Sequence, residues 1–114
     1  MSAPAPGEIR RGEICQGEIW WAETPSARRP VLVVTRTEAV PVLTWIVVAP
    51  VTSTIRGIPT EVPVGPPEGL DHDSVANFDD LRPILRSACT TRVGALDAAR
   101  RAEICTALRA LADC

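Results

Sequence analysis

Two continuous apolar runs constrain the fold of this chain more than any other feature. The first spans residues 29–34 (Arg-Pro-Val-Leu-Val-Val) and the second spans residues 46–53 (Ile-Val-Val-Ala-Pro-Val-Thr-Ser). Both runs are rich in β-branched residues and each is long enough for one strand, which predicts two strands that are buried on both faces. Polar groups stand at one end of each run: arginines begin the first, and hydroxyl side chains end the second.

An antiparallel pairing of these two strands would bring those polar ends together, because the start of one strand then lies beside the end of the other. Arg28 and Arg29 would meet the hydroxyls of residues 52–54 at one rim of the sheet. A guanidinium offers a planar fork of donors, and a hydroxyl can donate or accept. The sequence therefore predicts a rim that is suited to holding a phosphate.

The rest of the chain predicts short strands joined by turns, with one helix at the end. Further strands are expected at residues 18–23, 60–64 and 74–78, and Pro63 places the second of these at a sheet edge. The one strong helical pattern follows Asp97, a suitable N-cap. Its apolar stripe consists of Ile104, Cys105, Leu108, Leu111 and Ala112. The expected fold is α+β but mainly β: a small, partly open antiparallel barrel of five to seven strands, closed by a C-terminal α-helix.

The length of 114 residues suits a single core and is too short for two. Residues 1–15 are expected to form a disordered tail, since they begin with a small, Pro-rich segment, and residues 16–114 are expected to form the one domain. No apolar run reaches the ~18 residues of a membrane span, and no signal peptide is visible. We therefore expect a cytoplasmic protein without a membrane partner.

Composition argues against several classes of site. The formal charge of −2 disfavours a broadly basic coat, so any contact with nucleic acid must come from a local arginine cluster. The four cysteines include no C-x-x-C pair and the chain has one histidine, so a metal site is not expected. Cys105 is expected to be a small core residue. His72 lies between two acids in a turn that should be solvated, which disfavours a catalytic role.

Adjacent tryptophans in the first strand must point to opposite faces, because successive side chains alternate across a strand. One of Trp20 and Trp21 should therefore enter the core while the other covers a surface. Packing is favoured as their role, and stacking of the outer ring on a base stays open.

Four short motifs occur in a distinctive order and spacing. They are residues 17–22 (Gly-Glu-Ile-Trp-Trp-Ala), 28–33 (Arg-Arg-Pro-Val-Leu-Val), 50–53 (Pro-Val-Thr-Ser) and 73–75 (Asp-Ser-Val). Together with a terminal helix, they resemble the MazF/PemK/Kid-type toxins of bacterial toxin–antitoxin systems. The resemblance runs from about residue 17 to the end and is greatest to the short-loop mycobacterial members.

That resemblance implies a homodimeric endoribonuclease with an SH3-like barrel, which cleaves single-stranded RNA at short preferred sequences without a metal or other cofactor. In the reaction it implies, the ribose 2′-OH attacks the adjacent phosphorus and leaves a 2′,3′-cyclic phosphate and a 5′-OH end. It also implies a cognate antitoxin whose acidic C-terminal segment covers the RNA groove.

The resemblance also assigns candidate site residues. Arg29 matches the catalytic arginine, Thr52 matches a phosphate-contacting threonine, and Asp79 falls where some members carry a catalytic aspartate. Arg29 suits charge stabilisation of the phosphorane through its fork, and Asp79 would serve as a base if burial raised its pKa. The candidates for RNA contact are Ser53, Asn77, Arg82 and Arg28.

Two departures from the family pattern leave the acid and base of the reaction open. The loop before the Arg-Pro motif is cut to residues 23–27, and Asn77 stands where some members have a catalytic arginine. Structural roles compete with the functional ones: Arg29 would pair with Glu23 or Asp79, and Asp79 would cap a backbone N–H. For the whole chain, the alternative is a non-catalytic module that binds RNA or an extended peptide.

Overall fold

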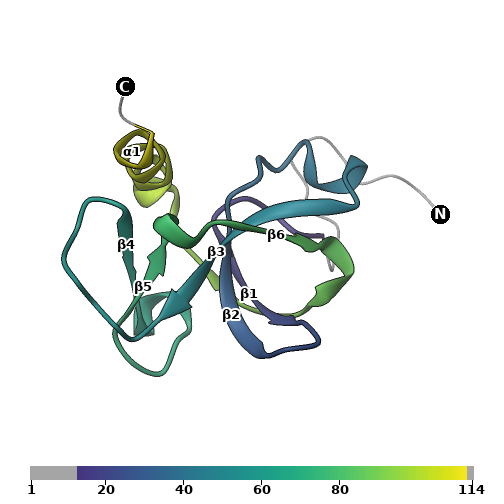
Figure 1. Cartoon of the computed structure of the whole chain (residues 1–114), viewed down its shortest axis with the longest axis horizontal. Coiled ribbons are helices and arrows are strands. Elements are labelled where there is room, and N and C mark those ends of the chain that lie inside the picture. Colours follow the sequence, from purple (N-terminus) through teal and green to yellow (C-terminus); the bar gives the residue numbers. More distant parts are fainter. Residues whose placement is uncertain (1–12, 113–114) are drawn as a thin grey trace.

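The computed structural model describes residues 13–112, which form seven strands and one α-helix (Figure 1). The strands are β1 (Glu18–Glu23), β2 (Arg28–Val33), β3 (Trp45–Thr52), β4 (Glu61–Val64), β5 (Ser74–Asn77), β6 (Arg82–Leu85) and β7 (Cys89–Ala95), and the helix is α1 (Ala102–Leu111). The expected mainly-β architecture, an antiparallel barrel closed by a terminal helix, is confirmed. Among the described residues, no helix combines the length and apolar character needed to cross a bilayer.

Every strand pair is antiparallel, and the long strand β3 connects the two halves of the sheet. Its first residues, 45–48, pair with β6, its middle residues, 48–50, pair with β2, and its last residues pair with β5. The order β4-β5-β3-β2-β1-β7, with β6 beside β3, curls into an open barrel (Figure 1). As Pro63 predicts, β4 lies at an edge of the sheet.

Alternation along the strands divides the core into two clusters. Ile19 and Leu32 are cross-strand partners and belong to the cluster that α1 covers, whereas Trp20 and Val31 are partners in the cluster inside the barrel. Strand β2 is therefore buried on both faces, as predicted. The second apolar run differs at Val47, which is 39% exposed because its face of β3 is not covered.

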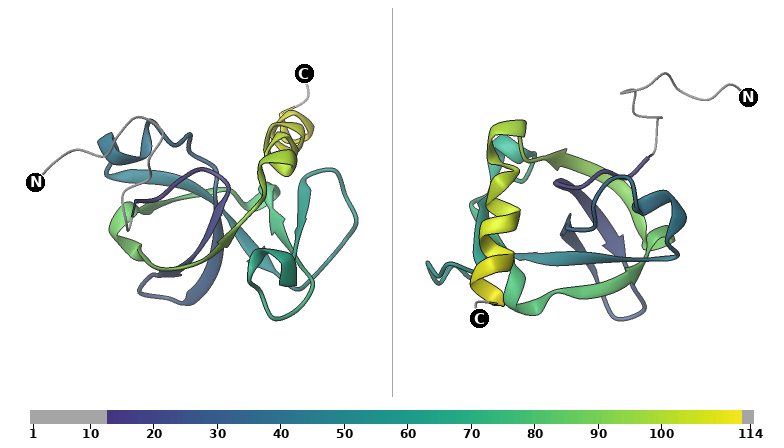
Figure 2. Two further views of the ribbon diagram at one scale, coloured as in Figure 1. Left: turned by 180° about the vertical axis from the view of Figure 1, so that it is seen from behind. Right: turned by 90° about the horizontal axis from the view of Figure 1, so that it is seen from above.

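The C-terminal helix differs from the expected one in its N-cap residue and in its buried apolar residues. Asp97 accepts from the N–H of Arg100 and caps a 3₁₀ turn (Ala98–Arg100), so α1 itself starts later, at Ala102. Ile104 and Ala107 form its buried face, and α1 packs along one side of the barrel against β4 (Figure 2). Of the predicted stripe, Cys105 and Ala112 are exposed, and so is Leu111. Cys105 is one residue from Ile104, so the ~100° helical step turns it away from the core.

At the N-terminal side, most of the predicted tail, residues 1–12, lies outside the described residues. Ile14 and Cys15 at its end are buried, so the packed unit begins before residue 16. The carboxylate of Glu18 accepts from the N–H of Cys15 at 2.7 Å. Burial raises the pKa of the Cys15 thiol, and the nearby charge of Glu18 raises it further.

Candidate functional site

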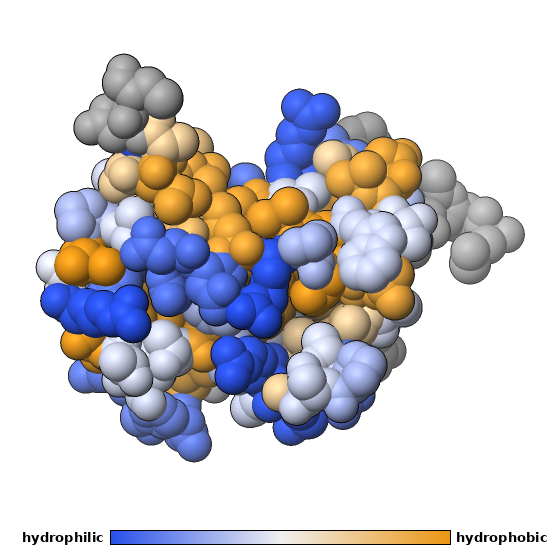
Figure 3. Space-filling model, viewed as in Figure 1, coloured by the Kyte–Doolittle hydropathy of each residue, from blue (hydrophilic) through white to orange (hydrophobic). Residues whose placement is uncertain are grey.

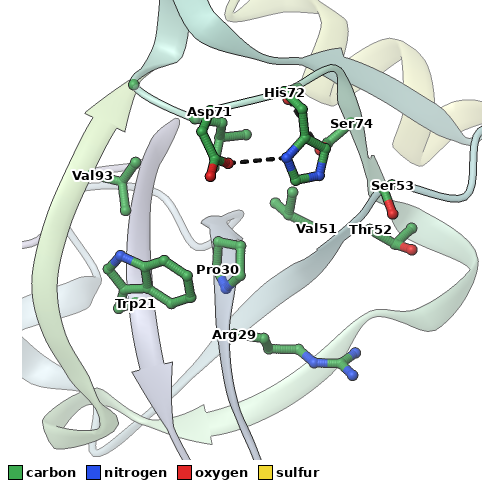
Figure 4. Close-up of a pocket in the computed structure, with 12 residues that line it drawn as sticks. Trp21, Arg29, Pro30, Val51, Thr52, Ser53, Asp71, His72, Ser74 and Val93 are labelled. Atoms are coloured by element: carbon green, nitrogen blue, oxygen red, sulfur yellow. Dashed lines mark hydrogen bonds and ion pairs between the residues drawn. The ribbon is translucent and has the colours of Figure 1, made fainter.

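The register of the β2–β3 pair places Arg29 beside Thr52. Val31 pairs with Pro50 and Leu32 with Ala49, so the same antiparallel register continued by two residues joins positions 29 and 52. Both side chains, with Ser53, line one open pocket of about 570 Å³ (Figure 4). The polar ends of the two apolar runs thus meet at one rim, as the antiparallel pairing predicts.

The two tryptophans of β1 point to opposite faces of the sheet, as the alternation of side chains along a strand requires. Trp20 is buried in the barrel, while the partly exposed ring of Trp21 forms a wall of the pocket (Figure 4). The Arg28 guanidinium carbon lies 4.3 Å from the centroid of the Trp21 ring, within the range of a cation–π contact. The outer tryptophan is therefore held flat beside the site.

The side chain of Arg29 is exposed and has no ion pair or hydrogen bond with another residue of the described range 13–112. The two acids considered as its partners are engaged elsewhere. Glu23 pairs with Arg28 at 3.3 Å, and Asp79 accepts from the Thr60 hydroxyl at 2.7 Å. The guanidinium fork of Arg29 is therefore available to an anion.

The hydroxyl of Thr52 already accepts one hydrogen bond from the backbone. Its Oγ1 accepts from the N–H of Thr54 at 3.2 Å. A hydroxyl also has one hydrogen to donate, so Thr52 can accept from its own loop and donate into the pocket at once. Ser53 is exposed beside it and lines the same pocket.

Two smaller depressions adjoin the pocket, because Arg29 lines all three. One, of about 180 Å³, is lined by Arg29, Arg82 and the short β1–β2 turn. The other, of about 190 Å³, is lined by Arg29 and Thr52 together with Asn77, Arg56 and others. The predicted contacts at Arg82 and Asn77 therefore lie along one groove with Arg29. Arg56 in this groove was missed from the sequence, although it stands four residues after Thr52.

Asp79 is not brought to Arg29. It is exposed and is absent from the linings of all three depressions that contain Arg29, whereas its neighbour Asp80 lines one of them. Asp79 was also considered as a cap for a backbone N–H. In the structure the Asn77 side chain is the cap, and it accepts from the N–H of Asp79 at 3.0 Å. Consecutive residues of a 3₁₀ turn point about 120° apart, so only one of the two aspartates can face the groove.

His72 lines the site, although sequence interpretation did not assign it there. It is solvent-exposed, as expected, but its ring also lines the pocket that holds Arg29, Thr52 and Ser53 (Figure 4). Its Nδ1 lies 3.0 Å from Oδ1 of Asp71. No local pattern could have predicted this, because the position depends on how the loop between β4 and β5 folds back over the sheet. Within residues 13–112, no three potential metal-ligating side chains gather at one point.

Comparison with known proteins gives a consistent relationship. The family model for "PemK-like, MazF-like toxin of type II toxin-antitoxin system" matches residues 15–112. The chain is 39% identical over 101 residues to probable endoribonuclease MazF5 of Mycobacterium tuberculosis, which covers 87% of this chain and 93% of that protein. It is 38% identical over 100 residues to probable endoribonuclease MazF2 of the same species, with 87% and 98% covered.

Solved structures agree with the sequence relatives. The M. tuberculosis toxin MazF-mt6 superposes with a TM-score of 0.79 at 35% identity, over 84% of this chain and 96% of that one. A MazE–MazF structure from Deinococcus radiodurans gives a TM-score of 0.71 at 27% identity, over 87% and 94%. With its barrel, its terminal helix and a family match over almost all described residues, this chain belongs to the PemK-like, MazF-like toxins of type II toxin–antitoxin systems.

Proposed function

We propose that this protein is a toxin that acts as a metal-independent endoribonuclease, cleaving single-stranded RNA at short preferred sequences. The observation that carries the proposal is the open groove in which an unpaired Arg29 guanidinium and the Thr52 hydroxyl line one pocket. The relatives named as endoribonucleases support the same class of activity.

In the proposed reaction, the ribose 2′-oxygen forms a bond to the adjacent phosphorus and the bond from phosphorus to the 5′-oxygen breaks. The products are a 2′,3′-cyclic phosphate and a 5′-OH end. Negative charge grows on the phosphorane oxygens, and the fork of Arg29 and the hydroxyl of Thr52 stabilise it. A guanidinium is not deprotonated in proteins, so Arg29 acts as a fixed charge and not as the proton donor.

The groove around this centre suits a single strand of RNA. The ring of Trp21, with Arg28 over it, offers a flat surface for one base. Arg82 and Arg56 lie in the flanking depressions, where they would contact neighbouring phosphates. This is the local arginine cluster that a chain of net charge −2 needs if it is to bind RNA.

Cleavage is tested by incubating the protein in EDTA with a long single-stranded RNA and mapping the new ends by sequencing. Wild type should cut at a short shared sequence and leave 2′,3′-cyclic phosphate ends. A 2′-deoxy nucleotide at the mapped position should block the cut. Arg29→Ala should lose at least ~10²-fold in rate, because it removes charge stabilisation from the transition state. Arg36→Ala, an exposed arginine beyond the other end of β2, is the matched control.

Dependence of cleavage on a divalent ion, or full activity in Arg29→Ala, would contradict this mechanism. Tight RNA binding with no cut in any sequence would instead establish the non-catalytic module.

We also propose that an antitoxin covers the groove with an acidic C-terminal segment. The unpaired guanidinium of Arg29 is the attachment point, since a carboxylate fits the same fork as a phosphate. A segment held there would exclude the substrate. A synthetic peptide of the cognate antitoxin's C-terminus should therefore inhibit cleavage in competition with RNA and bind weakly to Arg29→Ala.

The working unit is proposed to be a homodimer. Alternate residues of β3 and β6 leave an apolar outer face on this two-stranded ribbon, where Trp45 pairs with Leu85 and Val47 with Pro83. Trp45 is 57% exposed, and Leu85 and Val47 are exposed too. The hydrophobic surface in this region is visible in Figure 3. A second copy matches such an uncharged face better than an acidic antitoxin does, and a two-fold contact would cover both copies at once.

A further inference from the structure

The proposed reaction needs a base for the ribose 2′-OH, and the residues assigned so far do not supply one. Arg29 stays protonated, the hydroxyls of Thr52 and Ser53 are not basic, and Asp79 does not line the pocket. Two side chains with base chemistry line the pocket together with Arg29 and Thr52: His72 and the Asp71 carboxylate that contacts its ring (Figure 4). An imidazole is ordinarily the stronger base of the two.

The contact with Asp71 fixes which nitrogen of His72 is free. Nδ1 lies 3.0 Å from Oδ1 of Asp71. An ionised carboxylate only accepts, so in the neutral ring Nδ1 carries the hydrogen and Nε2 holds the lone pair. The ring is therefore in the tautomer that can take a proton through Nε2, and the carboxylate would stabilise the imidazolium that results.

The loop that presents His72 is anchored at its base. The buried carboxylate of Glu68 accepts from the N–H of Gly65 at 2.7 Å and pairs with Arg100 at 3.3 Å. Gly69, with φ of 95°, and Gly94 of β7 approach so closely that a side chain at either would collide with the other segment's backbone. The backbone before His72 is thus fixed against β7 and against the 3₁₀ turn that precedes α1, while the imidazole stays exposed and free to meet a substrate.

We propose that His72 is the general base of RNA cleavage, a role that rests on the nuclease function proposed above. Nε2 takes the proton of the 2′-OH as the 2′-oxygen bonds to phosphorus and the bond to the 5′-oxygen breaks. The departing 5′-oxygen takes a proton from water in the open pocket. The imidazolium then returns its proton to solvent, so the enzyme is restored. Asp71 is a positioning residue.

The charges around this histidine come from its own loop and from β2. On its own loop, Asp71 contacts the ring, whereas Asp73 points to Gly65 and lines a different depression. From β2, Arg29 lines the same pocket as the ring, and Arg28 lies over Trp21. The facing part of β7 is the uncharged Val93.

The test compares wild type with His72→Asn and His72→Arg, using a short RNA that carries the mapped cleavage site. A histidine is the side chain that ordinarily changes charge between pH 5 and 8. Wild-type kcat/KM should therefore rise with pH through one ionisation that both variants lack. His72→Asn should lower kcat by ~10²-fold or more with little change in KM. His72→Arg should lose as much, since it keeps a cation but offers no base. Asp71→Asn should show a smaller loss and a shifted pH profile.

Because the sequence contains one histidine, the Cε1–H group of its ring gives one NMR signal of its type in protein freed of affinity-tag histidines. That signal should shift when a 2′-O-methyl RNA of the same sequence is added. Three kinetic results would overturn the role of His72: wild-type activity in His72→Arg, a change in KM alone in His72→Asn, or a pH profile of His72→Asn that matches wild type. An NMR signal of His72 that does not move at saturation with the RNA would overturn it too. These outcomes leave Arg29-dependent cleavage intact, whereas absence of cleavage by wild type removes the nuclease proposal and the base together.

Discussion

Glu18 is a charged residue that the fold buries, and its contacts explain why the chain tolerates it. Its carboxylate accepts from the N–H of Cys15 at 2.7 Å, from Nε1 of Trp20 at 3.1 Å and from Nε of Arg92 at 2.7 Å. The side chain is 7% exposed. A buried carboxylate is costly unless it is paired and hydrogen-bonded. Glu18 meets both conditions, and by doing so joins the N-terminal residues to β1 and β7.

Replacing Glu18 by alanine should lower the free energy of unfolding by about 3 kcal/mol, because buried donors on Cys15 and Trp20 lose their acceptor. Urea denaturation of the two proteins measures the difference. Glu38→Ala removes an exposed carboxylate and should change the midpoint little. Equal midpoints for Glu18→Ala and wild type would show that the carboxylate contributes no net stability.

Sequence reasoning at the residue scale succeeded where a short-range rule decides position. Arg29 and Thr52 could be brought together because antiparallel pairing of two strong strands aligns their ends. The roles of Trp20 and Trp21 followed from alternation. The positions of Asp79 and His72 could not be predicted. The direction of the Asp79 side chain depends on the rotation of a 3₁₀ turn, and the position of His72 depends on a loop packed against β7.

At the scale of elements, α1 and the β4–β5 loop are joined by a small charged cluster. Arg100 donates to both carboxylate oxygens of Glu103, at 2.8 and 2.9 Å, and pairs with Glu68 in the loop. It also donates to the carbonyl of Pro63 at the end of β4. The hydrogen bond from Arg100 lowers the pKa of Glu103 below its usual range, and the same bond raises the pKa of Arg100.

This cluster predicts a loss of stability in acid. The pKa of Glu103 is lower in the folded than in the unfolded chain. The ionised carboxylate therefore contributes its full share of folding stability at pH values above the pKa of the unfolded chain. It is lost as pH falls below about 4.5 and passes through the folded pKa. Urea denaturation at a series of pH values should show a shallower acid loss for Glu103→Gln than for wild type. Parallel pH curves for the two proteins would contradict the linkage.

The missed elements, β6 and β7, have weak signals for physical reasons. β6 is four residues long and contains Pro83, which a strand tolerates only at an edge, and here β6 pairs with β3 alone. β7 contains Gly94 and has no buried residue, so the alternation that marks a strand is absent from it. The strand is formed by its backbone pairing with β1, which its own sequence pattern does not reveal. In contrast, β1 to β5 carry strong apolar or alternating signals and were predicted.

For the whole molecule, the uncovered face of the β3–β6 ribbon predicts self-association. Wild type should sediment as a dimer, and Trp45→Glu should sediment as a folded monomer because a charge at the centre of an apolar contact is costly to bury. Ile58→Glu, which places the same charge on another exposed apolar residue in the β3–β4 loop, should leave the dimer intact. A monomeric wild type, or a dimer that survives Trp45→Glu, would contradict this assignment of the interface.

The proposed cleavage requires Arg29 and Thr52 to act on one phosphodiester, and a double-mutant cycle in the cleavage assay tests this most directly. Arg29→Ala, Thr52→Val and the double variant are compared by kcat/KM on the mapped RNA site. If both side chains contact the same phosphorane, their effects are coupled and the double variant loses clearly less than the product of the two single losses. Losses that simply multiply, or a Thr52→Val variant as active as wild type, would show that the two residues do not share a substrate group.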